Sequence, residues 1–223
     1  MPVLRARGVR RLDRMVVSHA DLDHAGGLDA VRRDMRADDL LAPDGAGVPG
    51  ARPCLAGTSW TWDGVRFVVL HPPRHFPYLG NEASCVIRVE TRHGAVLLTG
   101  DIGADIEARL AAMQPAALRA DAVFVPHHGS RHSSSEAFAR ATGARLAIVS
   151  AGHANRFRHP NAQVVERWRA AGAQVVDTAG SGAVTLRSGP AGIVAERWRD
   201  RRPRLWDAAR RAAADAGLSY RRD

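Results

Sequence analysis

The stretch His19-Ala20-Asp21-Leu22-Asp23-His24-Ala25-Gly26-Gly27 follows a short apolar segment, Arg14 to Ser18, that we expect to form a strand. Within six residues it offers four side chains that can bind a metal ion, namely His19, Asp21, Asp23 and His24. Imidazoles and carboxylates crowd together at low cost only when a cation neutralises and coordinates them. The two glycines suit a sharp turn into a helix over Leu28 to Met35. The stretch therefore predicts a metal site where a strand gives way to a helix.

Two more expected strands end in residues of the same kinds. Ala95 to Thr99 runs into Gly100-Asp101, and Ala122 to Pro126 runs into His127-His128-Gly129-Ser130. Taken alone, Asp101 could simply cap the helix that follows it. Three strand ends that each deliver His or Asp are the arrangement expected of a two-metal hydrolytic site.

The remaining periodicity predicts a mixed α/β sandwich. Further strands are expected over Ser59 to Trp62, Val65 to Leu70, Ser84 to Glu90, Leu146 to Ser150, Val175-Val176 and Ala183 to Leu186. Helices are expected over Ile102 to Met113, with a buried stripe of Ile102, Ile106, Leu110 and Met113, over Ser134 to Thr142, with Ser133 or Ser134 as N-cap, and over Pro160 to Ala171. The segment from Ala42 to Pro53 is expected to be a flexible surface loop. Hairpins interrupt the alternation of strands and helices, which argues against a simple doubly wound sheet.

Composition narrows the class of protein. The 223 residues are 45% hydrophobic and 25% charged, which is typical of a globular domain. No apolar run approaches the roughly 18 residues that span a bilayer, and no signal peptide is visible. The net charge of +9 is carried entirely by arginine and favours a polyanionic partner, although genomic base bias explains the absence of lysine equally well. With only two cysteines, the chain cannot have a disulfide framework, although a single disulfide bond is possible. Neither cysteine has a partner at the spacing of metal ligands.

The C-terminal part of the chain differs from the rest. We expect one domain over residues 1–188 and an arginine-rich extension over 189–223. The extension contains Arg197, Arg199, Arg201, Arg202, Arg204, Arg210 and Arg211, with Trp198 and Trp206 among them. Two interpretations stay open: a solvated extension, or a basic arm for phosphate backbones or a membrane surface. The five tryptophans are spread along the chain, which indicates core packing rather than a base-stacking platform.

The three strand-end motifs together resemble the metallo-β-lactamase superfamily, whose fold is an αββα sandwich. More narrowly, four segments resemble the C-terminal hydrolase domain of ComEC proteins, the DNA-uptake channels of natural competence. These segments are Ser18 to Gly27, Asn81-Glu82-Ala83-Ser84, His127 to Ser130 and Asn155-Arg156-Phe157-Arg158-His159-Pro160. The resemblance covers about Val3 to Leu186. Superfamily folds normally begin with several strands before the first His motif, so the resemblance implies an N-terminally truncated sandwich, from a fragment or a split gene.

The resemblance also implies a ligand set for two divalent ions, zinc or manganese. His19 and Asp21 would hold the first ion, Asp23 and His24 the second, and Asp101 would bridge them. His127, or alternatively His128, would complete the first set. Asp21 stands where many members have a histidine, and its oxygen donor shifts the preference toward manganese or magnesium.

The implied function is metal-dependent hydrolysis of phosphodiester bonds in DNA, with a single strand as the expected substrate, during competence-related uptake. Asp23 would orient the attacking water and His128 would protonate the leaving oxygen, while Asn81, Ser130 and His159 would contact substrate. The alternatives are a small-molecule hydrolase acting on a lactone or phosphorylcholine ester, and a non-catalytic DNA-binding module. Partners would be DNA and the membrane channel of a ComEC-like protein. The chain as given is expected to be soluble, and membrane-associated at the extracytoplasmic face within such a protein.

Overall fold

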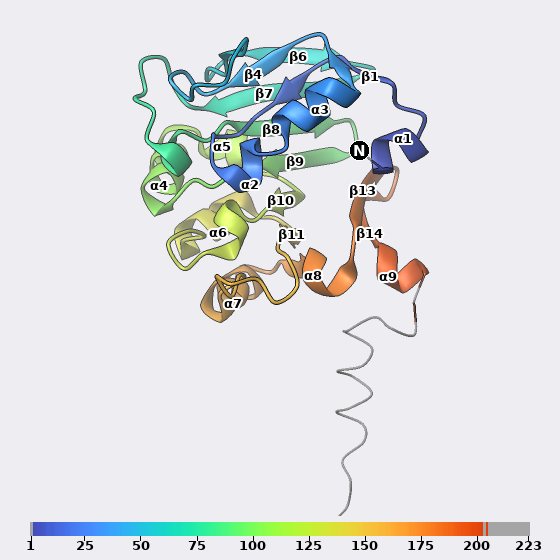
Figure 1. The fold of residues 1–223 in the computed structure, drawn as a ribbon. Coiled ribbons are helices and arrows are strands. Elements are labelled where there is room, and N and C mark those ends of the chain that lie inside the picture. The colour runs from blue at the N-terminus through green and yellow to red at the C-terminus, as the bar shows by residue number, and fades with distance from the viewer. Residues whose placement is uncertain (1, 203, 205–223) are drawn as a thin grey trace, which may run out of the picture.

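The computed structural model describes residues 2–202 and 204, and its largest element is a seven-stranded mixed sheet (Figure 1). The strand order is β12-β11-β10-β9-β8-β7-β6. The strands are β6 (Ser59–Trp62), β7 (Val65–His71), β8 (Val86–Thr91), β9 (Gly94–Leu98), β10 (Ala122–Phe124), β11 (Leu146–Val149) and β12 (Gln174–Asp177). Strands β6 to β9 pair antiparallel through hairpins, whereas β9 to β12 are parallel. All strands expected from residue 59 to residue 177 are confirmed, including the hairpin of β8 and β9.

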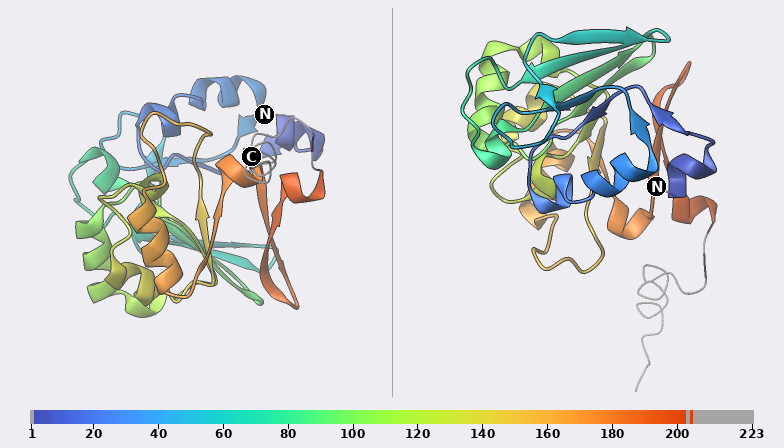
Figure 2. Two further views of the ribbon diagram at one scale, coloured as in Figure 1. Left: turned by 90° about the horizontal axis from the view of Figure 1, so that it is seen from below. Right: turned by 45° about the horizontal axis from the view of Figure 1, so that its top comes forward.

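Helices cover one face of this sheet (Figure 2). They are α4 (Ala104–Met113), α5 (Pro115–Leu118), α6 (Glu136–Thr142) and α7 (Ala162–Ala170). The main hydrophobic core lies between these helices and the sheet, where Leu97, Ile106, Phe138 and Trp168 are buried together. Trp168 therefore packs in the core, as expected for the tryptophans, whereas Trp62 and Trp198 are exposed.

The opposite face of the sheet is covered by a second, smaller β layer. Strands β2 (Met15–Val16), β4 (Leu40–Ala42) and β5 (Arg52–Pro53) form a parallel sheet, and helices α2 (Leu22–Ala25) and α3 (Leu28–Asp34) accompany it. Val17 and Leu40 pack against Leu28 on the helix side. Leu41 packs instead with Cys54 and Cys85, the latter next to β8 of the large sheet. The layers thus follow the order α, β, β, α, which confirms the expected sandwich.

The N- and C-terminal segments lie side by side at one end of the molecule (Figures 1 and 2). The first contains α1 (Pro2–Ala6), with β1 (Arg11–Leu12) paired to β3 (Arg36–Ala37). The second contains α8 (Thr178–Ser181), the antiparallel hairpin of β13 (Val184–Gly189) and β14 (Gly192–Arg197), and α9 (Trp198–Arg201).

Part of the predicted arginine-rich extension is folded as strand β14. The boundary predicted after residue 188 falls inside the hairpin, because β13 ends at Gly189 and β14 continues to Arg197. Glu196 pairs with Arg187 and Arg201, and Asp200 pairs with Arg197, so two of these arginines, Arg197 and Arg201, neutralise carboxylates within the same segment. Arg210, Arg211 and Trp206 lie outside the described residues.

Two local predictions were wrong. Met113 does not continue the buried stripe of α4: its side chain is 74% exposed, because the helix ends there and the chain turns away into Pro115. The N-cap of α6 is Ser135, whose Oγ accepts a hydrogen bond from Phe138 N at 3.2 Å. The backbone N–H groups of Ser134 and Ser135 are instead held by the buried carboxylate of Glu107.

The surface loop predicted from Ala42 to Pro53 is shorter than predicted, because only residues 43–51 lie outside helices and strands. Its two ends belong to strands β4 and β5, whose parallel pairing aligns Leu41 with Arg52 and Ala42 with Pro53.

Within the described residues, no helix is long and apolar enough to cross a membrane.

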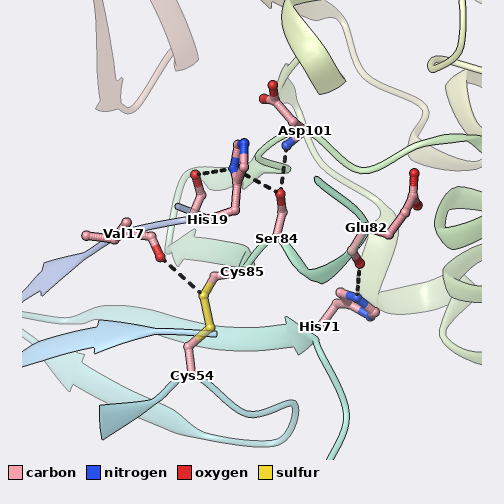
Figure 3. The surroundings of a disulfide bond; sticks show 9 residues. Val17, His19, Cys54, His71, Glu82, Ser84, Cys85 and Asp101 are labelled. Atoms are coloured by element: carbon pink, nitrogen blue, oxygen red, sulfur yellow. Dashed lines mark hydrogen bonds between the residues drawn. A yellow bond between two sulfur atoms is a disulfide. The ribbon is translucent and has the colours of Figure 1, made fainter. Parts of the chain in front are cut away.

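A disulfide between Cys54 and Cys85 joins the two β layers (Figure 3). Both residues are buried, and Cys85 N donates to Ser18 O at 2.9 Å, directly beside the first metal-binding motif. The one bridge left open by the sequence is therefore formed, and it closes a loop with a sequence separation of 31 residues.

Reduction of this disulfide is expected to lower the free energy of unfolding by about 3–4 kcal/mol, because the reduced unfolded chain regains the entropy of the open loop. Urea unfolding with and without a reductant measures the change. A Cys54→Ala/Cys85→Ala variant serves as control, because the reductant should not shift its midpoint. Equal midpoints for the native chain in both conditions would contradict the prediction.

Candidate metal centre

Parallel pairing brings the ends of three strands to one edge of the large sheet. Asp101 follows β9, His127 and His128 follow β10, and Ser150 follows β11. The loop from β2 to α2 carries His19 and Asp21, and α2 itself carries Asp23 and His24; both reach the same edge from the smaller β layer. Residues distant in sequence therefore meet where the two layers adjoin.

His19 is fully buried and surrounded by serine hydroxyls (Figure 3). Its Nδ1 lies 3.2 Å from Ser18 Oγ and 3.3 Å from Ser84 Oγ. Ser84 Oγ also accepts a hydrogen bond from Asp101 N at 3.0 Å, so one side chain connects the first motif to the end of β9. A hydroxyl oxygen can accept a hydrogen bond from Nδ1–H, which leaves the Nε2 lone pair of His19 free to bind a cation.

His24, Asp101 and His128 converge on one point. His24 Nε2 lies 3.2 Å from Asp101 Oδ1 and 3.1 Å from His128 Nε2. His128 Nε2 lies 3.4 Å from Asp101 Oδ2 and 3.3 Å from Asp23 Oδ2. The Nδ1–H of His128 donates to the carbonyl oxygen of Ser150 at 2.8 Å. Because a carbonyl only accepts, this bond directs the lone pair of neutral His128 to Nε2, toward the cluster.

The cluster perturbs the ionisation of its members. Burial, followed by the charge of His24, lowers the pKa of His19. Burial also opposes the charged form of His24, but the hydrogen bond and negative charge of Asp101 together raise the pKa of His24. Burial would raise the pKa of Asp101, yet the hydrogen bond from His24 and the charge of His128 hold that pKa below its ordinary value. The carboxylate of Asp101 is therefore ionised at neutral pH and requires positive charge nearby.

Backbone geometry keeps the strand ends close together. Gly100 has φ +55°, and a Cβ there would lie 2.7 Å from Ser84 Cβ, so only glycine permits this approach. His127 and His128 are also left-handed, with φ of 50° and 53°. Such conformations are unfavourable for residues with a side chain and persist where the surroundings impose them, frequently at functional sites.

The donors of this cluster fit a divalent ion. His19, His24 and Asp101 present ligand atoms within 4.8 Å of one another, and so do Asp23, His24 and His128. The buried Nε2 of His19 has no hydrogen-bond partner among the described residues. In this cluster the imidazole nitrogens face one another and a carboxylate, so several lone pairs meet without a hydrogen-bond donor between them. A bound cation would accept these lone pairs and balance the negative charge.

The other predicted site residues lie at different distances from this cluster. Asp21 Oδ2 is 3.8 Å from His19 Nε2 at an exposed position. His127 Nε2 is 4.0 Å from Asp101 Oδ2, farther than the corresponding atom of His128, and 3.4 Å from Asn81 Nδ2.

His159 and Ser130 differ in how they face the site. The ring of His159 lies 6.0 Å from that of His127, and burial, followed by the charges of His127 and His128, lowers the pKa of His159. Ser130 is buried in the turn, where its Oγ accepts a long hydrogen bond from His132 N at 3.4 Å. Its side chain thus supports the loop.

Reasoning from the sequence assigned no role to the serines that orient the histidines. Ser18 Oγ also lies 2.9 Å from His24 Nδ1, so one hydroxyl serves both imidazoles of the motif. The hydroxyl of Tyr78 accepts from Ala20 N at 2.8 Å and holds the loop from the other side. Ser18 has a sequence signal, because it immediately precedes His19, whereas Tyr78 and Ser150 come close only through the fold.

A cavity of about 260 Å³ borders the cluster. His24, Asp101 and His128 lie on its polar side, and apolar residues that include Val16, Ile87 and Phe124 form the rest. Groups of a bound molecule could therefore lie beside the metal-binding atoms while water is partly excluded.

Known proteins share this sequence pattern and fold. The family described as the metallo-beta-lactamase superfamily matches residues 2–153. The chain is 39% identical over 206 residues to competence protein ComA of Neisseria gonorrhoeae, covering 89% of this chain and 28% of that protein. It is 34% identical over 188 residues to recombination protein 2 of Haemophilus influenzae, covering 83% and 23%, respectively. The chain thus spans only about a quarter of the length of these relatives.

Solved structures show the same architecture at low sequence identity. A putative metal-dependent hydrolase from Parabacteroides distasonis superposes with a TM-score of 0.51 at 12% identity, over 75% of this chain and 76% of that one. CmlA, a diiron β-hydroxylase from Streptomyces venezuelae, also gives a TM-score of 0.51, at 14% identity and over 75% and 44% of the two chains. With the family match over more than half of its length and the αββα layers in place, the chain belongs to the metallo-β-lactamase superfamily.

Proposed function

We propose that this chain is a metal-dependent phosphodiesterase that cleaves DNA, with single strands as the preferred substrate. The observation that carries the proposal is the convergence of three imidazoles and two carboxylates from the loop after β2, helix α2 and the ends of β9 and β10. They are His19, His24, His128, Asp23 and Asp101. Two groups of donors that share His24 support a pair of divalent ions, manganese or zinc, rather than one.

The distances place the donors in two groups that share His24, namely His19 with His24 and Asp101, and Asp23 with His24 and His128. Asp21, 3.8 Å from His19, would add an oxygen donor to the first group. From the sequence we expected His127 as the ligand, with His128 as the alternative. His128 Nε2 lies closer to Asp101 than His127 Nε2 does, and it contacts Asp23 as well. If His128 is the metal ligand, His127 is available for another role, and its ring lies beside Asn81 and His159.

Residues of this chain would then divide the work of hydrolysis. Bound divalent ions withdraw electron density from the phosphoryl group and make a water molecule acidic enough to attack at neutral pH. Asp23, whose side chain is exposed beside His128, would accept a hydrogen bond from that water and orient it. His127 would donate a proton to the leaving oxygen in place of His128. Asn81, at hydrogen-bond distance from His127, would hold its ring.

The net charge supports a polyanionic substrate over a neutral one. A charge of +9 on 223 residues attracts a phosphate backbone without reading its sequence. The relatives named for competence and recombination support the same class of substrate. The cavity beside Asp101 favours a second candidate, hydrolysis of a small ester or lactone that fills it.

The setting of the domain is part of the proposal. The matched region is only about a quarter of the length of these relatives. On the resemblance to the C-terminal hydrolase domain of ComEC proteins, we place this domain within or beside a membrane channel for DNA, at its extracytoplasmic face. The buried disulfide supports this location, because such bonds form and persist in oxidising compartments.

The full chain loaded with Mn²⁺ or Zn²⁺ is expected to cleave labelled single-stranded DNA, and a chelator should abolish the cleavage. Gel electrophoresis of the products measures it, with a lactone and a phosphorylcholine ester as competing test substrates. Cleavage of either small substrate without cleavage of DNA would favour the second candidate. Binding of DNA without any hydrolysis would indicate a non-catalytic module.

Asp101→Asn is expected to lower the cleavage rate by about 100-fold or more and to reduce the bound metal, because the amide cannot neutralise cation charge. Elemental analysis of the loaded protein measures the metal content. Asp63→Asn, the same change in the turn between β6 and β7, should retain both properties. A native chain that stays metal-free after loading would contradict the two-ion proposal.

Truncation after Arg202 is expected to flatten the salt dependence of DNA binding, since residues 203–223 contain five arginines. Each lost phosphate contact should change the slope of log affinity against log salt by about 0.7 for a single strand. Truncation here leaves β14 and α9 whole, unlike a deletion from Arg197. An unchanged slope would identify the segment as a solvated extension.

A further inference from the structure

An exposed aromatic ring lies next to the candidate metal centre. Phe157, in the loop between β11 and α7, is 62% exposed. Its ring stacks on that of His159 with centroids 5.7 Å apart and planes at 17°. His159 in turn lies 6.0 Å from His127, edge to face. A short series of rings therefore leads from solvent to the site.

The loop that carries Phe157 is fastened to the site. Asn161 N donates to Gly129 O at 2.9 Å, directly after the two histidines of the β10 end. A Cβ on Gly129 would lie 2.7 Å from Pro160 Cβ, so the absence of a side chain allows the loop to approach this closely. The position of the loop relative to the histidines is thus set by packing and by a backbone hydrogen bond.

Asn155 stiffens the loop from within. Its Oδ1 accepts from His159 N at 2.9 Å, and its Nδ2 donates to the carbonyl oxygens of Gly152 at 3.0 Å and His159 at 2.7 Å. The loop also contains two non-glycine residues with positive φ, Ala154 at 50° and Arg158 at 55°. A large apolar side chain presented to solvent by a rigid, strained loop beside a catalytic site is a candidate for substrate contact.

Arg156 supplies a cation at the same place. Its Cζ lies 4.6 Å from the centroid of the Phe157 ring. An exposed contact of this kind is weak, so a planar ligand can displace the guanidinium from the ring. The displaced guanidinium can then bind phosphate with two parallel hydrogen bonds. Ring and cation together match the two parts of a nucleotide, a flat base and an anionic phosphate.

We propose that Phe157 is a base-stacking platform that positions single-stranded DNA for cleavage, with Arg156 on the adjoining phosphate. The proposal rests on the proposed function and specifies how that site takes its substrate. Only an unpaired base presents a free face to the ring, because the bases of a duplex are stacked on one another. The platform therefore accounts for a preference for single strands that charge alone does not provide.

Binding to a labelled 12-nucleotide thymidine strand and to an abasic strand of equal length tests the platform. Fluorescence anisotropy in the presence of chelator measures affinity without cleavage. The native chain is expected to bind the thymidine strand more tightly. Phe157→Ala should weaken that binding by about tenfold and leave binding to the abasic strand unchanged. Phe157→Trp should restore it, because indole also stacks on bases.

Trp62→Ala is the matched control. Trp62 is also an exposed ring near an arginine, with Arg14 Cζ 5.5 Å from its centroid, but it lies on β6 at the far edge of the sheet. This variant should bind both strands as the native chain does. The urea midpoint of Phe157→Ala should equal that of the native chain, since the side chain is mostly exposed.

The outcomes separate the two proposals. Equal weakening of both strands by Phe157→Ala, or no preference of the native chain for bases, would overturn the platform while cleavage by the native chain still supported the nuclease. A native chain that cleaves DNA but whose Phe157→Ala variant binds and cleaves equally well would also overturn the platform alone. If the native chain neither binds nor cleaves any strand, the proposed function fails, and the platform fails with it.

Discussion

The carboxylate of Asp101 is almost completely buried at the edge of the large sheet, and two imidazole nitrogens lie within 3.4 Å of its oxygens. A buried negative charge is unfavourable unless positive charge compensates it. The surrounding imidazoles supply only part of that charge. The Nε2 atoms of His24 and His128 lie 3.1 Å apart, so protons on both atoms would repel each other. The arrangement of the site follows from this requirement, which a divalent ion satisfies.

The rest of the structure holds these groups in place. Ser84 accepts from Asp101 N and contacts His19, so it couples the ends of two β layers. One residue further on, Cys85 is bonded covalently to Cys54 of the smaller layer. Gly100 allows the strand end to approach Ser84 without a steric clash. Packing between the layers therefore determines the metal-binding geometry, although few of these residues can bind metal themselves.

The proposed metal ligands and the proposed substrate contacts lie in different parts of the scaffold. The loop after β2, helix α2 and the ends of β9 and β10 carry the proposed ligands, and sheet pairing fixes the strand ends. The segment from Ser150 to Asn161 supplies Phe157 and His159 beside them and belongs to a connecting loop. Rigid strands with variable loops at their ends allow one hydrolytic centre to serve different substrates. In the proposed function, the loops, the cavity and the surface charge would accordingly decide between DNA and a small ester.

The sequence alone predicted the sandwich fold, which the structure confirms. It also proposed His19, Asp23, His24 and Asp101 as metal ligands, because they stand in short motifs that follow expected strands, and the fold brings these four residues close together. It also located the central strands, whose apolar runs have clear turns around them. It missed β14, where charged residues masked the strand pattern, and the short β4 and β5, which are strands only through pairing with each other and with β2. Such pairing depends on contacts between distant segments, which local patterns do not contain.

Only the tertiary structure decided how the side chains are oriented. Adjacent His127 and His128 are equivalent in sequence, but left-handed backbone angles and the bond to Ser150 O direct His128 into the cluster. Likewise, nothing in the sequence distinguishes Phe157 from a core residue until the loop presents it to solvent beside His159. Residue type sets which chemistry is available. Backbone direction and distant contacts set which atoms can meet.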